Sequence, residues 1–272
     1  MAHCAAQGTH WVIPPMLAGI FNVLLESPAM PIETYIAQVE SIENLTHDVR
    51  RLDLRLIEPK TIDFKPGQFV SFEMPDPQTG RLLTRAYSIA SQPSRSDVIT
   101  LLFNLVSGGP GSGFLFHLKA GEKTQFKGPA GHFYLRDNPE RELLFVASGT
   151  GIAPIRSMLL ANAERSNPRP ATLFWGLRSQ RDLYDQEELA ELTRRTPTLT
   201  AITTLSRPEP GWSGESGRVL RLIEERIASV KNLAVYLCGN SGMIADATLL
   251  LQKKGLCPIY REKYYDGEGD GA

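Results

Sequence analysis

Hydrophobic and polar residues follow different patterns in the two halves of the chain. Between about residue 35 and residue 128 they alternate over short runs, as at Leu52, Leu54 and Leu56, which charged residues separate. This period of two predicts strands with one buried face, and the glycine and proline turns between the runs predict a small antiparallel barrel or sandwich. Residues 113–118 form the one stretch in this half with helical spacing.

Beyond about residue 135, short apolar runs typical of buried strands alternate with runs of helical spacing. The expected strands are residues 142–147, 171–175, 198–205 and 233–237, and the expected helices are residues 155–163, 186–194, 219–227 and 244–253. This alternation predicts a parallel sheet with helices on both faces. The predicted fold class is therefore two-domain, with an antiparallel β-barrel followed by an α/β parallel-sheet domain.

A polar turn at residues 136–139 separates the two patterns. We expect the barrel at residues 33–137, the α/β domain at residues 138–265, a disordered N-terminal extension at residues 1–32 and a C-terminal tail at residues 266–272. The extension is either a family-specific addition or the product of a start codon assigned too early. Its apolar stretch, residues 12–25, is too short to span a bilayer, so we expect no stable membrane insertion.

Composition narrows the class of protein further. A hydrophobic share of 42% and a charged share of 22% are typical of a soluble globular protein. The net charge of -1 argues against non-specific binding to nucleic acid, which requires a strongly positive surface. Cys4, Cys238 and Cys257 are scattered, which favours a reducing, cytoplasmic location over a disulfide framework, and they are too few for a four-thiolate iron–sulfur site. We expect no metal site.

Residues 85–91 combine a cation, an aromatic ring and a hydroxyl within one strand-like run. The guanidinium of Arg85 suits a phosphate, the ring of Tyr87 suits a flat aromatic ligand, and the hydroxyl of Ser88 can hydrogen-bond a ring nitrogen. The alternative is an ordinary half-buried strand whose arginine is solvated.

Small residues fill the loop at residues 108–113, directly before the helical stretch of the first domain. Backbone N–H groups can approach an anion there, the start of the helix adds a favourable dipole, and Ser112 can donate its hydroxyl to a phosphate oxygen. The alternative is a flexible hairpin loop.

Residues 148–154 end the first strand of the second domain and open its first helix. A doubly wound sheet binds the phosphates of a dinucleotide at this place. The pattern is Gly-x-Gly-x-x-Pro rather than the usual fingerprint with a third glycine, and Pro154 suits a first helical turn. The alternative is a turn that any α/β domain needs.

Four polar residues follow strands or precede a helix on the expected ligand-binding edge of the sheet: Arg178, Ser206, Arg207 and Arg218. An enzyme specific for NAD usually places an acidic group near this edge for the ribose 2′-hydroxyl. Arginines there would instead form a pocket for a 2′-phosphate, which favours NADP over NAD. The alternative is a solvated rim.

The last predicted strand leads into Cys238, Gly239 and Asn240, at the carboxyl edge where ligands bind. A buried, inert thiol is the alternative interpretation of the cysteine. Two tyrosines near the end of the chain, Tyr264 and Tyr265, are either core residues or a lid over a flat ring.

Taken in order, five stretches resemble the ferredoxin/flavodoxin–NADP reductases, most closely the bacterial type, over about residues 33–265. They are RAYS at residues 85–88, GPGS at residues 109–112, GPAGHF at residues 128–133, GTGIAP at residues 149–154 and LCGN at residues 237–240. The resemblance implies an oxidoreductase that holds FAD in the barrel and NADP(H) in the α/β domain.

The resemblance also implies roles for individual residues. Arg85 would bind the FAD pyrophosphate, Tyr87 would stack on the isoalloxazine and Ser88 would hydrogen-bond near its N5 atom. Other FAD contacts would come from Ala86, Phe103, Asn104, Leu105, Gly109, Pro110, Gly111 and Ser112. Thr150, Gly151, Gly239 and Asn240 would line the nicotinamide side, and Tyr264 or Tyr265 would cover the other flavin face. Ser88, Cys238 and Glu262 would form the catalytic group.

The main functional hypothesis is a flavoenzyme that exchanges a hydride between NADP(H) and FAD and exchanges single electrons with ferredoxin or flavodoxin. Exposed cations, with Lys60, Lys65, Arg81 and Arg95 as candidates, would dock such a partner. One alternative is an NADH-dependent reductase component that delivers electrons to an oxygenase system, which the sequence at residues 212–217 favours. Another is a flavin-binding sensor with an inactive nicotinamide site.

Overall fold

The computed structural model describes residues 32–76 and 79–264. The predictions for the N-terminal extension (Ile32 apart), for Tyr265 and for the tail at residues 266–272 therefore concern residues outside the described part of the chain. Within that part, no helix has both the length and the apolar character needed to cross a membrane.

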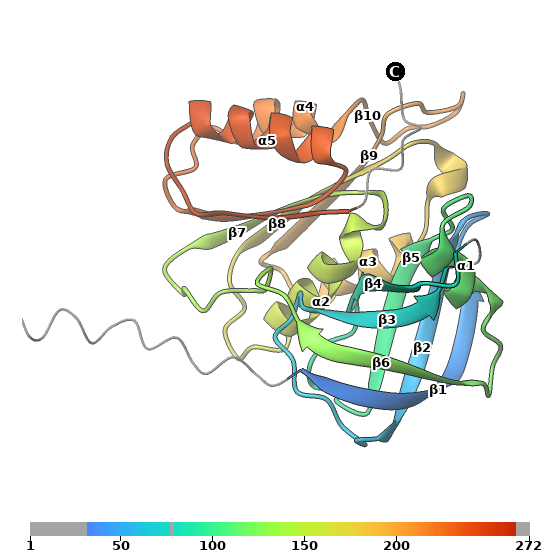
Figure 1. Ribbon diagram of the computed structural model, residues 1–272. Coiled ribbons are helices and arrows are strands. Elements are labelled where there is room, and N and C mark those ends of the chain that lie inside the picture. The colour runs from blue at the N-terminus through green and yellow to red at the C-terminus, as the bar shows by residue number, and fades with distance from the viewer. Residues whose placement is uncertain (1–31, 77–78, 265–272) are drawn as a thin grey trace, which may run out of the picture. The chain divides into compact units, whose positions relative to one another are not determined.

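The first domain is an antiparallel sheet that curls into a barrel (Figure 1). Its strands are β1 (Glu33–Asn44), β2 (Val49–Glu58), β3 (Phe69–Pro75), β4 (Leu82–Ser88), β5 (Val98–Asn104) and β6 (Lys123–Ala130), with one helix, α1 (Pro110–His117). Neighbours in the sheet follow the order β4-β3-β6-β1-β2-β5. An isolated bridge between Ile89 and Leu101 joins the chain after β4 to β5 and closes the barrel.

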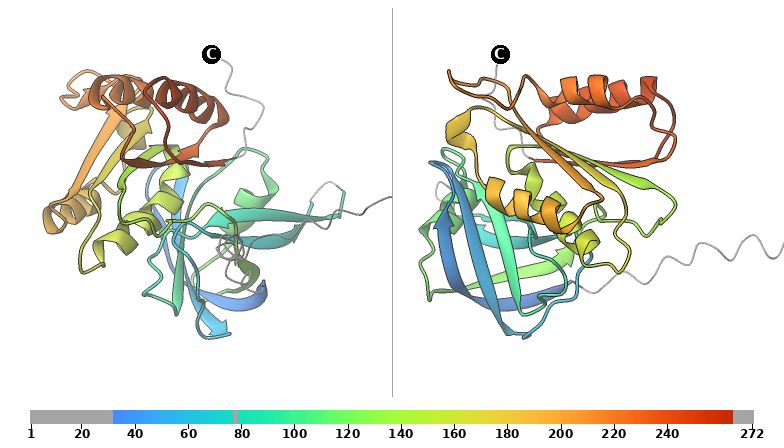
Figure 2. Two further views of the ribbon diagram at one scale, coloured as in Figure 1. Left: turned by 90° about the vertical axis from the view of Figure 1, so that its left-hand side faces the viewer. Right: turned by 180° about the vertical axis from the view of Figure 1, so that it is seen from behind.

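The second domain is a parallel sheet in the order β10-β9-β8-β7-β11-β12. Its strands are β7 (Glu142–Ser148), β8 (Ala171–Leu177), β9 (Leu199–Leu205), β10 (Glu215–Ser216), β11 (Leu233–Gly239) and β12 (Ile259–Lys263). Its helices are α2 (Ile152–Ala163), α3 (Gln186–Arg195), α4 (Val219–Arg226) and α5 (Ser241–Lys253). Figure 1 shows α4 and α5 on one face of this sheet, and the reverse view in Figure 2 shows α3 on the other.

The hydrophobic cores follow this arrangement. Seventeen buried side chains, among them Phe72 and Phe126, fill the barrel, and a separate cluster lies under α4 and α5. A third cluster continues across the domain boundary, because Val49, Ala90 and Leu102 of the barrel pack with α2 and the face of the sheet that it covers. The two domains therefore share one apolar interface.

The two predicted folds are confirmed, and the alternation in β2 is as expected, since Leu52, Leu54 and Leu56 are all buried. Several element boundaries differ from the expected ones, and the structure gives a physical reason for two of them. Helix α1 begins at Pro110 rather than at residue 113, because proline lacks an N–H and fits a first helical turn. Strand β4 ends at Ser88 rather than at residue 91, because Ile89 leaves the edge of β3 and bridges to β5.

Strand β12 was not predicted from the sequence. It lies at the edge of the parallel sheet and pairs with β11 alone, with Cys238 opposite Glu262. Its residues are exposed or partly buried, and none is fully buried, so the strand lacks the continuous apolar run that marks a central parallel strand.

Candidate functional site

Strand β4 presents Arg85 beside the start of helix α1. A Cβ at Gly111 would stand 2.7 Å from both the Cγ of Arg85 and the hydroxyl of Tyr87, so only glycine lets the helix approach this closely. Arg85 is exposed, and its guanidinium donates a hydrogen bond to the carbonyl of Thr84. An exposed cation beside a helix N-terminus is a suitable site for the phosphates of a dinucleotide.

Tyr87 is half-buried, with its ring against the edges of Phe72 and Phe103. Burial raises the pKa of its phenol, so the ring remains neutral at any physiological pH. A neutral aromatic ring fixed by its neighbours can support a flat heterocycle, so β4 and α1 together fit FAD. Ala86, between Arg85 and Tyr87, is exposed.

The loop before α1 differs from the sequence expectation in one respect. Ser112 is buried and accepts a hydrogen bond of 3.0 Å from the backbone N–H of Val106, so it closes the loop on itself. Gly109 is the residue before the helix, and Pro110 and Gly111 form its first turn. The Gly109 N–H donates to the carbonyl of Val106 and proline has no N–H, so the backbone N–H groups of Gly111 and Ser112, rather than the serine hydroxyl, are the donors that the first turn offers to an anion.

The three predicted FAD contacts at the end of β5, Phe103, Asn104 and Leu105, have different surroundings. Phe103 is buried in the barrel core, and Leu105 is 42% exposed. Asn104 accepts a hydrogen bond of 3.2 Å from the hydroxyl of Thr150 in the second domain. The predicted FAD strand and the predicted nicotinamide turn are thus in direct contact.

Ser88 and Tyr264, 176 positions apart in the sequence, meet where the two domains face each other. The Tyr264 hydroxyl donates to the Ser88 Oγ at 2.9 Å, and the Tyr264 backbone N–H donates to the carbonyl of Gly239 at 3.0 Å. Tyr264 therefore lies against the residue at which the resemblance places the flavin ring.

Cys238 of β11, next in the chain to Gly239, and Glu262 of β12, close to Tyr264, are paired on neighbouring strands. Cys238 is fully buried, and burial, with a smaller effect from Glu262, raises the pKa of its thiol well above the ordinary value. It remains a neutral thiol. Burial also raises the pKa of Glu262 to about 7, so this carboxyl can hold or release a proton near neutral pH.

The turn after β7 is held by close backbone contacts. A Cβ at Gly151 would stand 2.4 Å from the carbonyl oxygen of Cys238, so this turn can rest on β11 only with glycine there. Gly239, with φ 145°, similarly faces the Ser148 side chain. Asn240 caps α5 by accepting from the N–H of Met243 at 2.8 Å, and its own N–H donates to the Ser148 Oγ.

Two aromatic residues that the sequence analysis did not single out support the same turn. The indole N–H of Trp175 donates to the carbonyl of Gly149 at 3.0 Å, and the hydroxyl of Tyr184 donates to the same oxygen at 3.2 Å. Their rings meet edge to face, 4.9 Å apart. The position of Trp175 near the end of β8, next to the glycine turn of β7, is the signal that could have found it.

The predicted 2′-phosphate residues lie at the outer edge of the sheet. The Arg207 N–H donates to the carbonyl of Arg178 at 2.7 Å, which places the ends of β8 and β9 together, and Ser206 lies beside them. Arg218 precedes α4 and follows β10, which pairs with the end of β9. All four side chains are exposed, and the three arginines form no ion pair with any residue in the described part of the chain.

Comparison with known proteins gives matches to both domains. Residues 36–134 match the oxidoreductase FAD-binding domain, and residues 145–248 match the oxidoreductase NAD-binding domain. The chain is 33% identical over 251 residues to the reductase component of phenol 2-monooxygenase from Pseudomonas sp. (strain CF600), covering 89% of this chain and 69% of that protein. It is 32% identical over 219 residues to ferredoxin–NADP reductase B of Sorangium cellulosum, covering 78% and 89%.

Among solved structures, the Amycolatopsis cytochrome P450 reductase GcoB superposes with a TM-score of 0.77 at 28% identity, covering 86% of this chain and 70% of that one. The matched domains cover the barrel and most of the parallel sheet, in the order in which the chain presents them. The chain is therefore an oxidoreductase of the ferredoxin reductase family, with an FAD-binding domain followed by an NAD(P)-binding domain.

Proposed function

We propose that this protein is an NAD(P)H-dependent, FAD-containing reductase component that delivers electrons to an oxygenase system. The observation that carries the proposal is the kind of relative it matches. Besides the phenol 2-monooxygenase component, these include reductase components of a naphthalene 1,2-dioxygenase/salicylate 5-hydroxylase system at 32% identity and of propane 2-monooxygenase at 32% identity. The sequence at residues 212–217 favours the same function.

When bound, FAD supplies the conversion between the two-electron chemistry of a nicotinamide and single-electron transfer. The residues of the protein would bind the FAD, orient its ring and shield the ring from water. Arg85 and the N–H groups at the start of α1 would hold the phosphates, while Tyr87 would support the flavin ring. Ser88 would offer its hydroxyl to the ring edge, and Tyr264, whose hydroxyl donates to Ser88, would cover the flavin and give way to a nicotinamide.

Cys238, Thr150 and Gly151 shape the nicotinamide side and exclude water from it. Glu262 holds a proton there near neutral pH. We also propose that Arg178, Ser206, Arg207 and Arg218 bind the 2′-phosphate of NADP(H), and that the division into residues 33–137 and 138–265 marks the FAD and NAD(P) domains.

The second candidate is the ferredoxin/flavodoxin–NADP reductase that the motifs alone favoured. The relative from Sorangium cellulosum and the unpaired arginines of the outer edge, considered within the described residues, support it. The oxygenase assignment has more support, because several of the matched relatives are oxygenase reductase components. In both candidates the partner is a redox protein.

Anaerobic reduction followed by acceptor assays separates the candidates. The purified, FAD-loaded protein is mixed with NADH or NADPH, and the loss of flavin absorbance is followed; the reduced protein is then mixed with a [2Fe–2S] ferredoxin of an oxygenase system or with a flavodoxin. The proposal expects efficient reduction by NADH or by NADPH, and faster transfer to the ferredoxin than to the flavodoxin. Bleaching by NADPH alone, with transfer to flavodoxin, would overturn it in favour of the second candidate. A protein that is not reduced by either nucleotide would instead be a flavin sensor.

A further inference from the structure

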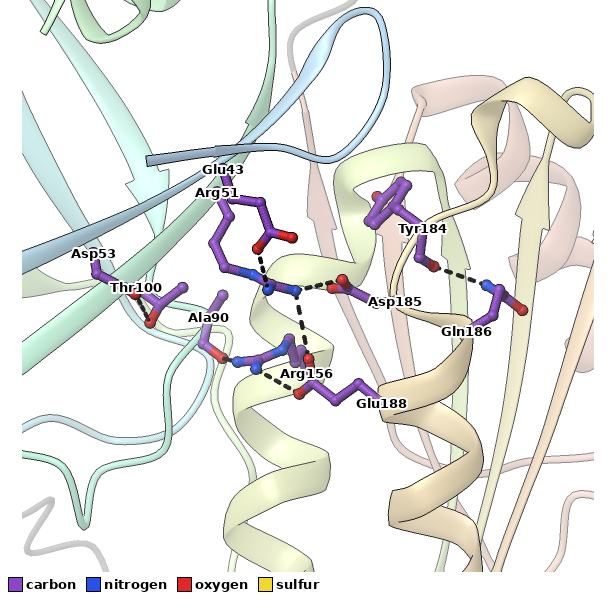
Figure 3. Close-up of polar contacts among 10 residues, drawn as sticks. All are labelled: Glu43, Arg51, Asp53, Ala90, Thr100, Arg156, Tyr184, Asp185, Gln186 and Glu188. Atoms are coloured by element: carbon purple, nitrogen blue, oxygen red, sulfur yellow. Dashed lines mark hydrogen bonds and ion pairs between the residues drawn. The ribbon is translucent and has the colours of Figure 1, made fainter. Parts of the chain in front are cut away.

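A charged cluster crosses the boundary between the two domains, away from the cofactor contacts described above. Arg51 of β2 in the barrel forms ion pairs with Asp185 and Glu188 of the second domain and with Glu43 of β1 (Figure 3). Arg156 of α2 completes the cluster by donating to Glu188 at 2.5 Å and to the carbonyl of Ala90 at 2.7 Å. Two guanidinium groups thus share one carboxylate across the boundary.

The cluster is partly removed from water. The side chains of Arg51, Arg156 and Asp185 are 20%, 19% and 13% exposed. The Nε atoms of both arginines are buried and have no hydrogen-bond partner among the described residues. Removing these charged groups from water costs free energy, and the attraction between the ion-pair partners offsets that cost only in part. Well-packed apolar residues of similar volume would often give a fold that is as stable or more stable. Buried ion pairs are therefore weak evidence for stability, but they are effective at fixing one register between two packed surfaces.

The backbone conformation of Asp185 is unusual and directs its side chain toward Arg51 rather than toward its own helix. It precedes α3 with φ 55° and ψ 17°, a left-handed conformation that residues other than glycine rarely adopt. An aspartate in this position commonly caps its helix, yet within the described chain its side chain makes no capping bond and reaches Arg51 instead. Burial raises the pKa of the Asp185 carboxyl, and Arg51 opposes that rise.

Asp185 directly follows Tyr184, whose hydroxyl donates to the carbonyl of Gly149. Gly149 starts the short helical turn Gly149–Gly151, in which Thr150 contacts Asn104 of the barrel. One loop therefore joins the ion-pair cluster on the barrel to the turn that lines the nicotinamide side. A displacement of Asp185 would be transmitted to Gly149 through one buried ring.

We propose that Arg51, Asp185 and Glu188 form an interdomain latch that, through Tyr184, positions the turn Gly149–Gly151 against the flavin-binding strand. Arg51 and Asp185 act as positioning residues, since neither touches the residues that hold the cofactors. The alternative is that the cluster only adds stability to the interface.

The test compares Arg51→Met and Asp185→Asn with Arg55→Met. Arg55 is the matched control, because it lies on the same strand and pairs with Glu40 and Asp97, both within the barrel. The first readout is hydrogen–deuterium exchange of peptides containing Gly149–Gly151, with and without FAD. We expect about tenfold faster exchange in both latch variants, since the turn loses a constraint, and no change in Arg55→Met.

The second readout is flavin reduction by NADH under anaerobic conditions. We expect the rate at saturating NADH to fall about tenfold in the latch variants, with little change in NADH affinity or FAD content, because positioning acts on the reacting geometry rather than on binding. Arg51→Lys should recover part of the rate, since one ammonium cannot hold every partner of a guanidinium.

Equal exchange and equal reduction rates in Arg51→Met and Arg55→Met would overturn the latch. If Arg51→Met does not fold, Asp185→Asn and Glu188→Gln provide the test, because each weakens an ion pair of the same cluster. Wild-type exchange and reduction rates in both of these variants would also overturn the latch. Neither readout involves an electron acceptor, so the outcome is independent of whether the protein serves an oxygenase.

Discussion

The proposed nucleotide site has an inner end, at the domain boundary beside Ser88, and an outer end, at the loops after β8 and β9, and the two ends differ in burial and charge. At the inner end, Ser88 and Cys238 are buried, and Tyr264 bonds to Ser88 across the domain boundary. At the outer end, Arg178 and Arg207 are exposed on loops and form no ion pair within the described part of the chain.

The difference reflects what each end must do. Burial at the inner end raises the pKa values of Cys238 and Glu262 and fixes their positions, which would suit a hydride transfer that depends on exact positioning. The exposed cations of the outer end remain hydrated, so in the proposed role they would distinguish a 2′-phosphate from a hydroxyl with little effect on the chemistry. Under the proposed function, packing at the inner end would therefore control reactivity, and surface charge at the outer end would control nucleotide preference.

The largest effect that we expect concerns the inner carboxyl. Because burial raises the pKa of Glu262 from 4.5 to about 7, the folded protein binds more protons than the unfolded chain between these values. The contribution of Glu262 to the stability of the folded protein should therefore be complete below pH 4.5 and be lost as the pH rises through about 7. The free energy of unfolding should fall by on the order of 3 kcal/mol over this range. Glu262→Gln should remove that fall, as measured by urea unfolding at about pH 4, below both pKa values, and at about pH 8, above both.

The control for that measurement is Glu187→Gln, which changes an exposed carboxylate on α3. It should leave the pH dependence as in the wild type. An unchanged pH dependence in Glu262→Gln would mean that the inner end is as well hydrated as the outer end.

Arg85 sharpens the comparison, because it is exposed like the outer arginines but packs against Gly111. Arg85→Ala removes a charge-assisted contact to phosphate, so FAD should bind about 10- to 100-fold more weakly, equivalent to about 1.5–3 kcal/mol. FAD fluorescence titration measures this loss. Arg81→Ala, an exposed arginine just before β4, is the matched control, and an equal loss in both variants would remove Arg85 from the site.

Substitutions of Tyr264 test whether its ring occupies the place of the nicotinamide beside Ser88. Tyr264→Ser vacates the space beside Ser88, so oxidised nucleotide should bind about tenfold more tightly, since no ring has to be displaced first. Tyr264→Phe keeps the ring and loses only the hydroxyl bond, and its affinity should lie close to that of the wild type. Equilibrium titration with NADP+ measures both, and identical affinities in all three proteins would rule out Tyr264 as a lid.

The smallest effect should come from the outer end. Arg207→Ala should weaken NADPH binding about fivefold while leaving NADH binding unchanged, because a solvated cation contributes about 1 kcal/mol or less. Titrations with both nucleotides measure this. Arg194→Ala on α3, which also changes an exposed arginine, should affect neither. Equal weakening for NADH and NADPH would show that Arg207 does not contact a 2′-phosphate.

Much of the fold was predictable from local patterns. The alternation of apolar and charged residues around Leu52 and Leu54 predicts a strand buried on one face. The continuous apolar run of β7 predicts a strand buried on both faces. Motifs within one turn or strand were equally accessible, as with Arg85 and Tyr87 on β4. In each case the physical signal lies in residues that are close together in the sequence.

The remaining features depend on residues far apart in the chain. Strand β12 is an edge strand with no apolar run of its own, and it exists because β11 offers it a partner. The hydroxyl of Ser112 looked free in the sequence, but the fold engages it with Val106. Trp175 and Tyr184 acquire a role only because β8 lies next to β7.

The sequence by itself determined the two fold classes, their order and the type of cofactor that each domain binds, because periodicity and short motifs are local properties. Only the tertiary structure decided that Tyr264 meets Ser88 and that Arg51 meets Asp185 across the domain boundary. Such contacts carry no local signal, since they depend on how two separately patterned domains pack on one shared apolar surface.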